Sequence, residues 1–253
     1  MSDASIATAT WSTLVETASA PYQRSGRFAW HFARGKLRHD PVFSHLIARG
    51  VIAPRSRVLD IGCGQGLLAS LVRAAASMAS QGRWPGDWAE APVDVRVAGI
   101  EVLARDVARG RAALGDGAEL VCADMRTATF AAADTVVLLD VLHYLSIAEQ
   151  DAVLMRVRAA LPVGGRLVLR VGDAAASARF AASSWVDRLV TLARGQGFSR
   201  HAGRTLASWL ERLRELGFAV ASEPMRKGTP FANVLVIGTV VAGDRTPVGT
   251  STP

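Results

Sequence analysis

Four acidic residues stand where short apolar runs end, and a glycine-rich turn follows the first of them. These acids are Asp60, Glu101, Asp124 and Asp140. In "RVLDIGCGQGLLASLV", three glycines follow at alternate positions, namely Gly62, Gly64 and Gly66. Carboxylates accept hydrogen bonds from hydroxyl and amino groups, and a turn without side chains lets a ligand approach the backbone. This combination predicts a site for a small polar ligand.

The spacing of the glycines differs from that of two common phosphate-binding turns. A dinucleotide fold prefers G-x-G-x-x-G, but Leu67 stands where the last glycine would be. A phosphate loop needs Gly-Lys-Ser/Thr, which the turn lacks. We therefore favour a nucleoside-like ligand without a pyrophosphate, with a nicotinamide oxidoreductase as the alternative. A lone acid at a strand end can also be only a cap or a turn former.

Hydrophobic patterning predicts the elements that carry these residues. Expected strands cover residues 58–61, 95–101, 118–124, 134–140 and 166–171, and expected helices cover residues 67–79, 105–114 and 147–160. Strands that alternate with helices at this spacing imply a parallel sheet with both faces covered. A helix over residues 206–216 and two closely spaced strands follow, and we expect these strands to pair antiparallel.

Composition sets limits on the class of protein. The chain of 253 residues has a formal net charge of +7, from 29 basic and 22 acidic residues. Almost all of the bases are arginine, so a compositional bias competes with an anionic partner as the explanation. No apolar run approaches the roughly 20 residues that span a bilayer, and no secretory signal is evident. With two cysteines and no disulfide framework, we expect a cytoplasmic protein.

Five segments in order resemble the motifs of class I S-adenosylmethionine-dependent methyltransferases. They are "VLDIGCGQG", "GIE", "CADM", "LLDVLHYL" and "LPVGGRLVL", and they span residues 57–171. The resemblance implies a single Rossmann-like α/β domain with a seven-stranded, mostly parallel sheet, a C-terminal antiparallel hairpin and helices on both faces. It implies S-adenosylmethionine as the cofactor and methyl transfer as the reaction. A cofactor-binding regulator that catalyses nothing is the alternative.

The resemblance also assigns roles to residues of the site. Asp60 is expected near the methionine amino group, Glu101 at the ribose hydroxyls, Asp124 at the adenine amine and Asp140 facing the methyl group. The remaining cofactor-binding residues are expected to be Gly62, Cys63, Gly64, Gly66, Val102 and Met125. Between Asp60 and Glu101 lies an inserted loop with two tryptophans, yet the strand pattern continues beyond it.

Catalysis of methyl transfer needs a general base only when the acceptor arrives protonated. His143 is the candidate for that base, with Tyr144 beside it, and both residues can instead simply line the pocket or begin a helix. The histidines have no metal-ligand spacing, so no metal site is expected. The fourth motif lacks the N/D-P-P-Y/F pattern used on DNA bases and protein amides, which argues against those acceptors.

The N-terminal segment "PYQRSGRFAWHFARGKLRHDPVF" interleaves basic and aromatic residues. One interpretation is an amphipathic lid helix with a solvated basic face. The other is recognition of an acid, a phosphopantetheine arm or an acidic carrier protein, with Tyr22, Arg34 and Lys36 as substrate-binding residues. Single-stranded RNA would use similar ingredients, although we do not expect nucleic acid. Part of the segment resembles methyltransferases found with bacterial aryl-polyene and fatty-acid-like biosynthesis, which favours a small aromatic or acyl acceptor.

The expected organisation is one catalytic domain with additions. Residues 1–50 would form an N-terminal helical lid that faces the substrate. Residues 51–242 would form the methyltransferase domain, with insertions at about 80–94 and 172–204. Residues 243–253 would be a disordered tail.

Overall fold

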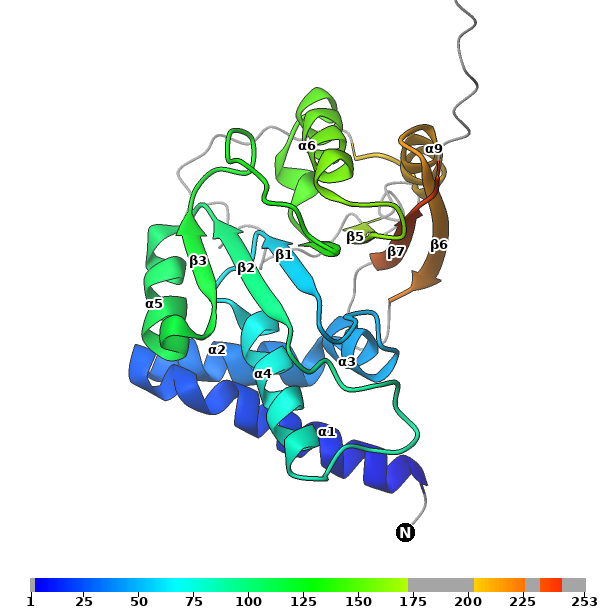
Figure 1. The fold of residues 1–253 in the computed structure, drawn as a ribbon. Helices are drawn as coiled ribbons and strands as arrows, with labels where there is room; N and C mark the ends of the chain where they lie inside the picture. The colour runs from blue at the N-terminus through cyan, green and yellow to red at the C-terminus, as the bar shows by residue number, and fades with distance from the viewer. Residues whose placement is uncertain (1–2, 173–202, 226–232, 243–253) are drawn as a thin grey trace, which may run out of the picture.

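The computed structural model describes residues 3–172, 203–225 and 233–242, and a seven-stranded sheet forms its centre (Figure 1). The strands are β1 (Arg57–Ile61), β2 (Arg96–Glu101), β3 (Glu119–Cys122), β4 (Thr135–Leu139), β5 (Arg166–Gly172), β6 (Phe218–Pro224) and β7 (Asn233–Val240). The α-helices are α1 (Asp3–Ser19), α2 (Arg27–His39), α3 (Pro41–Ala48), α4 (Leu67–Ser80), α5 (Ala104–Leu114), α6 (Ile147–Ala160) and α9 (Leu206–Glu215). Short 3-10 helices are η1 (Ala20–Ser25), η2 (Gly115–Gly117) and η3 (Leu142–Tyr144).

The strand order β3-β2-β1-β4-β5-β7-β6 confirms the expected fold class. Strands β1 to β5 run parallel, β7 pairs antiparallel with β5, and β6 pairs antiparallel with β7. Strands β2 and β3 lie on one side of β1, and the later strands β4 and β5 lie on its other side. Ligands of open parallel sheets bind at such a switch point, at the carboxyl ends of the strands.

Helices cover both faces of the sheet (Figure 1). One buried apolar cluster joins α4 and α5 to the sheet and includes the N-terminal helices outside them. A second cluster packs α6 and α9 on the opposite face. The long apolar stretches of the central strands follow from this arrangement, because a strand covered on both faces buries successive side chains.

The N-terminal helices form an outer layer on α4 and α5, and only part of this segment reaches the carboxyl ends of the strands. Leu14 and Val15 of α1 are fully buried in the cluster that includes α4. The Ser70 hydroxyl of α4 donates to the backbone carbonyl of Ala18 in α1 at 2.6 Å. Helix α1 thus belongs to the packed outer layer, and the lid expected over residues 1–50 stays a prediction.

The inserted loop after α4 leaves the strands undisturbed. Trp88 packs against Trp11 of α1 and against Trp84, with ring centroids 6.5 and 5.3 Å apart. In Figure 1 the loop lies beside α1, at the end of the sheet opposite to the strand carboxyl ends. The parallel register between β1 and β2 still places Asp60 beside Gly99.

Two of the predicted segments lie mostly or wholly outside the described residues. These are the insertion after β5, of which residues 173–202 are not described, and the tail of residues 243–253. No described helix is long and apolar enough to cross a membrane.

Candidate functional site

The glycine turn lies between the carboxyl end of β1 and the segment that follows β4. Gly62 donates its backbone N–H to the carbonyl of Ile100 at 2.7 Å, and its φ is +77°. A Cβ at this position would collide with Val141, so only glycine fits. At Gly64, by contrast, a Cβ would meet nothing within 4 Å, which leaves open space against the backbone.

Glu101 ends β2 with its carboxylate held beside the turn. It is buried, and its Oε2 accepts the backbone N–H of Gly64 at 3.0 Å, while Oε1 accepts that of Leu103 at 2.9 Å. Each carboxylate oxygen can accept a further hydrogen bond. The group is thus orientated to receive two hydroxyls from a ligand.

Asp60 ends β1 and is also buried. Burial, with a smaller contribution from the negative charge of Glu101, raises the pKa of Asp60 to about 7. Among the described residues, no hydrogen bond or ion pair engages the Asp60 carboxylate. Gln65 in the adjacent turn is buried as well, and its Oε1 atom has no hydrogen-bond partner. The Gln65 Oε1 atom is thus a buried acceptor without a donor, and the desolvated Asp60 carboxylate lines the same cavity, so a cationic ligand group there would relieve both costs.

Two cavities flank the glycine turn. The first has a volume of about 180 Å³, and the residues lining it include Gly62, Glu101, Val102, Asp124, Met125 and Tyr144. The second has a volume of about 140 Å³, and the residues lining it include Asp60, Gly62, Cys63, Gly64, Gln65 and Asp140. Gly62 belongs to both, so the predicted cofactor residues gather around one turn.

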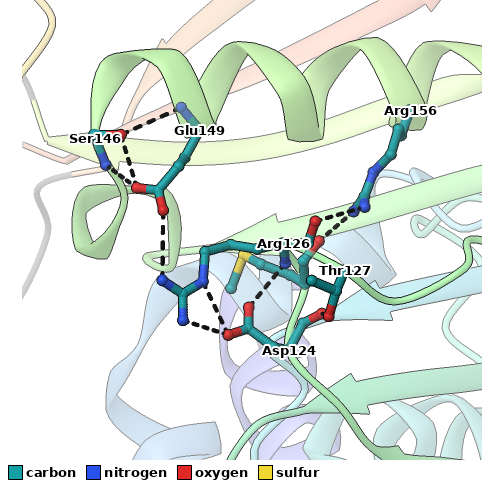
Figure 2. Close-up of polar contacts among 7 residues, drawn as sticks. Asp124, Arg126, Thr127, Ser146, Glu149 and Arg156 are labelled. Atoms are coloured by element: carbon teal, nitrogen blue, oxygen red, sulfur yellow. Dashed lines mark hydrogen bonds and ion pairs between the residues drawn. The ribbon is translucent and has the colours of Figure 1, made fainter.

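The first cavity has an ion-pair network at its edge (Figure 2). The Asp124 carboxylate accepts the Arg126 guanidinium at 2.6 and 2.9 Å and the Arg126 backbone N–H at 2.8 Å. These hydrogen bonds hold the pKa of Asp124 below its usual value. Asp124 lies two residues beyond the end of β3 at Cys122, although the sequence had suggested a strand that continued to Asp124.

The N-terminal segment contributes to the second cavity through Phe32, Lys36 and Phe43. This wall combines two aromatic rings with one ammonium group. Cys63 lies in the same cavity, and burial raises the pKa of its thiol, which keeps it protonated. A buried, protonated thiol is a weak nucleophile, and the expected place of Cys63 at the cofactor stays a prediction.

Sequence reasoning missed Arg170 and Asp40, which fix one side of the second cavity. Arg170 lies in β5 with only 2% of its surface exposed, and its guanidinium pairs with the carboxylates of Asp40 and Asp140. Lys36 also pairs with Asp40 at 2.8 Å. Burial opposes ionisation of Asp40, but the hydrogen bond from Arg170 and the charge of Lys36 lower its pKa to about 2. An arginine inside the apolar run "RLVLRV" was the available signal, because a buried charge needs a partner.

Some predicted site residues are not brought together with the others. Tyr22 is fully buried, and its hydroxyl donates to the Gln65 carbonyl at 2.9 Å. Arg34 pairs with Glu16 of α1 at 2.8 Å. His143 is exposed, with its ring centroid 3.9 Å from that of Tyr144. None of the three lines either cavity, and the described residues contain no cluster suited to a metal ion.

Comparisons with known proteins agree with this geometry. A family model described as a methyltransferase domain matches residues 29–223, while no curated protein sequence matches the chain. An O-methyltransferase family protein from Burkholderia thailandensis is 19% identical with a TM-score of 0.56, over 88% of this chain and 63% of that chain. Magnesium protoporphyrin IX methyltransferase from Synechocystis PCC 6803, solved with bound SAH (S-adenosylhomocysteine), is 19% identical with a TM-score of 0.53, over 84% and 88% of the two chains. This chain thus spans less than two thirds of the Burkholderia protein.

The family match covers most of the chain and all five of the ordered motifs. It removes the nicotinamide oxidoreductase as an alternative, since that class of enzyme carries a different glycine turn. The chain belongs to the methyltransferase domain family.

Proposed function

We propose that this enzyme methylates a small aromatic or acyl molecule that carries an acidic group. The observation that carries the proposal is the second cavity, where Phe32, Phe43 and Lys36 face the glycine turn from outside the βαβ core. The aromatic rings suit an apolar body, and the ammonium suits a carboxylate or phenolate. Residues 1–50 would act as the substrate-facing segment through the end of α2 and the start of α3, with residues 51–242 as the catalytic domain.

The residues around the turn fit the cofactor. The buried Asp60 carboxylate and the Gln65 Oε1 atom, which has no donor, suit the ammonium of the methionine moiety. Glu101 has two orientated oxygens for the ribose hydroxyls. Asp124, with Met125 and Val102 in the same cavity, suits the adenine. The open space over Gly64 leaves room for close approach to the backbone.

The cofactor supplies an activated methyl group, so the protein's task is to align the acceptor and exclude water. Phe32 and Phe43 would exclude water from the second cavity, and Lys36 would bind the acidic group of the acceptor. Arg170 would keep this wall in place by joining Asp40, at the start of α3, to Asp140 at the end of β4. His143 stays a prediction as general base.

A carrier-bound form of the acceptor has its own supporting observation. Phe28 of α2 is 65% exposed, and it stacks on Phe32 with ring centroids 6.2 Å apart. The Arg109 guanidinium also lies over the Phe28 ring, 4.9 Å from its centroid. A basic and aromatic surface that continues into the second cavity suits an acyl chain presented by an acidic carrier protein. The resemblance of this segment to aryl-polyene and fatty-acid-like methyltransferases supports the same acceptors.

Turnover with labelled S-adenosylmethionine tests the proposal. The acceptors are phenols, aromatic and aliphatic carboxylates, and acyl chains on a carrier protein, each supplied separately. Transfer to one of the acidic acceptors, but not to neutral analogues of the same size, is the expected result. Transfer only to the neutral analogues, or to no member of the set, contradicts the proposed acceptor class while cofactor binding stays intact.

Lys36→Met and Arg34→Met form a matched pair for the acceptor site. Both remove a positive charge from α2, but only Lys36 lines the second cavity. We expect Lys36→Met to raise the KM of the acceptor at least several-fold with SAH affinity unchanged, and Arg34→Met to alter neither. Equal losses of acceptor and SAH affinity in Lys36→Met would place Lys36 at the cofactor's carboxylate instead.

A further inference from the structure

Arg126 holds the carboxylate at the first cavity in one orientation (Figure 2). Its guanidinium donates from Nε and Nη2 to the Asp124 Oδ2 atom, and its backbone N–H donates to Oδ1. The two side-chain donors saturate Oδ2, whereas Oδ1 receives a single hydrogen bond and can accept another. Asp124 therefore presents one free acceptor position toward a ligand, and no donor.

Arg126 is itself anchored from two directions. Its Nη1 atom lies 3.4 Å from Glu149, whose carboxylate accepts the backbone N–H and hydroxyl of Ser146 in the capping box of α6. Arg156 of α6 donates to the backbone carbonyls of Met125 and Arg126. The start and the middle of α6 thus fix the position of the residues that line the first cavity.

We propose that Arg126 is a positioning residue that sets the enzyme's preference for a 6-amino purine in its cofactor. This inference rests on the proposed role of Asp124 at the adenine. An exocyclic amine can donate to the free Oδ1 atom, whereas the 6-oxo group of hypoxanthine would face a carboxylate that can only accept. Without Arg126, the carboxylate can rotate or exchange its partners for water, and the penalty against the oxo group falls.

A merely structural role for Arg126 predicts a different outcome. Its side chain is about half exposed, so the ion pair with Asp124 contributes little to folding stability. If Arg126 only supported the local backbone, its loss would weaken both purines equally. The ratio of the two affinities therefore separates the two roles.

Calorimetry with SAH and S-inosylhomocysteine, which has a 6-oxo group in place of the 6-amino group and a proton on N1, measures this ratio. The proteins are wild type, Arg126→Ala, Arg126→Lys and Arg57→Ala. Arg57 is a matched control because it also donates from its side chain and backbone to one carboxylate, that of Asp134, at the opposite ends of the strands. Circular dichroism confirms that each variant is folded.

We expect wild type and Arg57→Ala to prefer SAH by about tenfold or more, the size of the penalty for an unsatisfied polar group. Arg126→Ala should reduce the preference at least several-fold, and Arg126→Lys should restore part of it, since lysine keeps the charge but not the fork. Asp124→Asn should also reduce the preference, and adding Arg126→Ala to it should change nothing further.

Two results would overturn the inference while leaving the proposed cofactor site in place. If Arg126→Ala kept the wild-type preference for SAH over S-inosylhomocysteine, and wild type bound SAH, the positioning role of Arg126 would be wrong and the cofactor site would stand. Additive effects of Arg126→Ala and Asp124→Asn on the preference would show that Arg126 does not act through Asp124. Absence of SAH binding by folded wild type would instead overturn the proposed cofactor site, and this inference with it.

Discussion

Replacement of Asp60 by asparagine should stabilise the ligand-free protein at neutral and alkaline pH. The folded protein holds the Asp60 pKa at about 7, compared with an ordinary value of 3.8. Because the raised pKa means that the folded state binds the proton more tightly, stability decreases as pH rises from about 4 to 7. Above pH 7 the full cost of the buried charge is present, and Asp60→Asn removes it.

The size of the effect follows from the shift. About three pKa units at about 1.4 kcal/mol each give a cost on the order of 4 kcal/mol at alkaline pH. Asparagine must still find hydrogen bonds in the same buried position, and an unsatisfied amide costs about 1–3 kcal/mol. The net gain at pH 8 should therefore be about 1–3 kcal/mol. The hydrogen-bonding cost of asparagine is the same at pH 5 and at pH 8. The stability gain from Asp60→Asn should therefore be about 3 kcal/mol larger at pH 8 than at pH 5.

Urea unfolding of both proteins without cofactor, at pH 5 and at pH 8, measures these quantities. Asp134→Asn is a control, because Arg57 lowers the pKa of Asp134 by hydrogen bonding and by charge. Asp134 is ionised in the folded and the unfolded protein at both pH values, so its replacement should lower stability equally at pH 5 and pH 8. The same dependence of stability on pH in wild type and Asp60→Asn would refute the reasoning. It would mean that water or a movement of the turn relieves the charge.

Three further predictions concern the residues around the two cavities. Glu101→Gln should weaken SAH binding at least tenfold by calorimetry without unfolding the chain, because it replaces a charged acceptor of two hydroxyls; a change of less than about twofold would assign the ribose to another acid. Arg170→Met should lower the free energy of unfolding by about 3–5 kcal/mol in urea, since it leaves the buried Asp40 carboxylate with Lys36 as its remaining partner; a loss below about 1 kcal/mol would show that water replaces the guanidinium. His143→Gln should lower kcat most strongly at neutral and alkaline pH if the residue is a general base, because only the neutral imidazole accepts a proton; an unchanged pH profile of kcat would show that His143 is not the base.

The sequence by itself determined the fold and the order of the acidic residues along the strand ends. Alternating apolar runs and helical segments specify parallel βαβ units, and the carboxyl ends of parallel strands meet at one edge. For that reason Asp60 and Glu101 come together at the glycine turn despite the 41 positions between them. The inserted loop has no influence on this, because it packs on α1 at the other end of the sheet.

Only the tertiary structure decided which residues of the N-terminal segment reach the site. Residues two apart on a helix point to different faces, so Arg34 and Lys36 were never equivalent, but the direction in which α2 packs was needed to choose Lys36. The ion pairs of Arg170 with Asp40 and Asp140 join positions 130 and 30 residues apart. A local pattern carries no information about such pairs, because they form only when the whole chain has packed and the buried charge must find its partner.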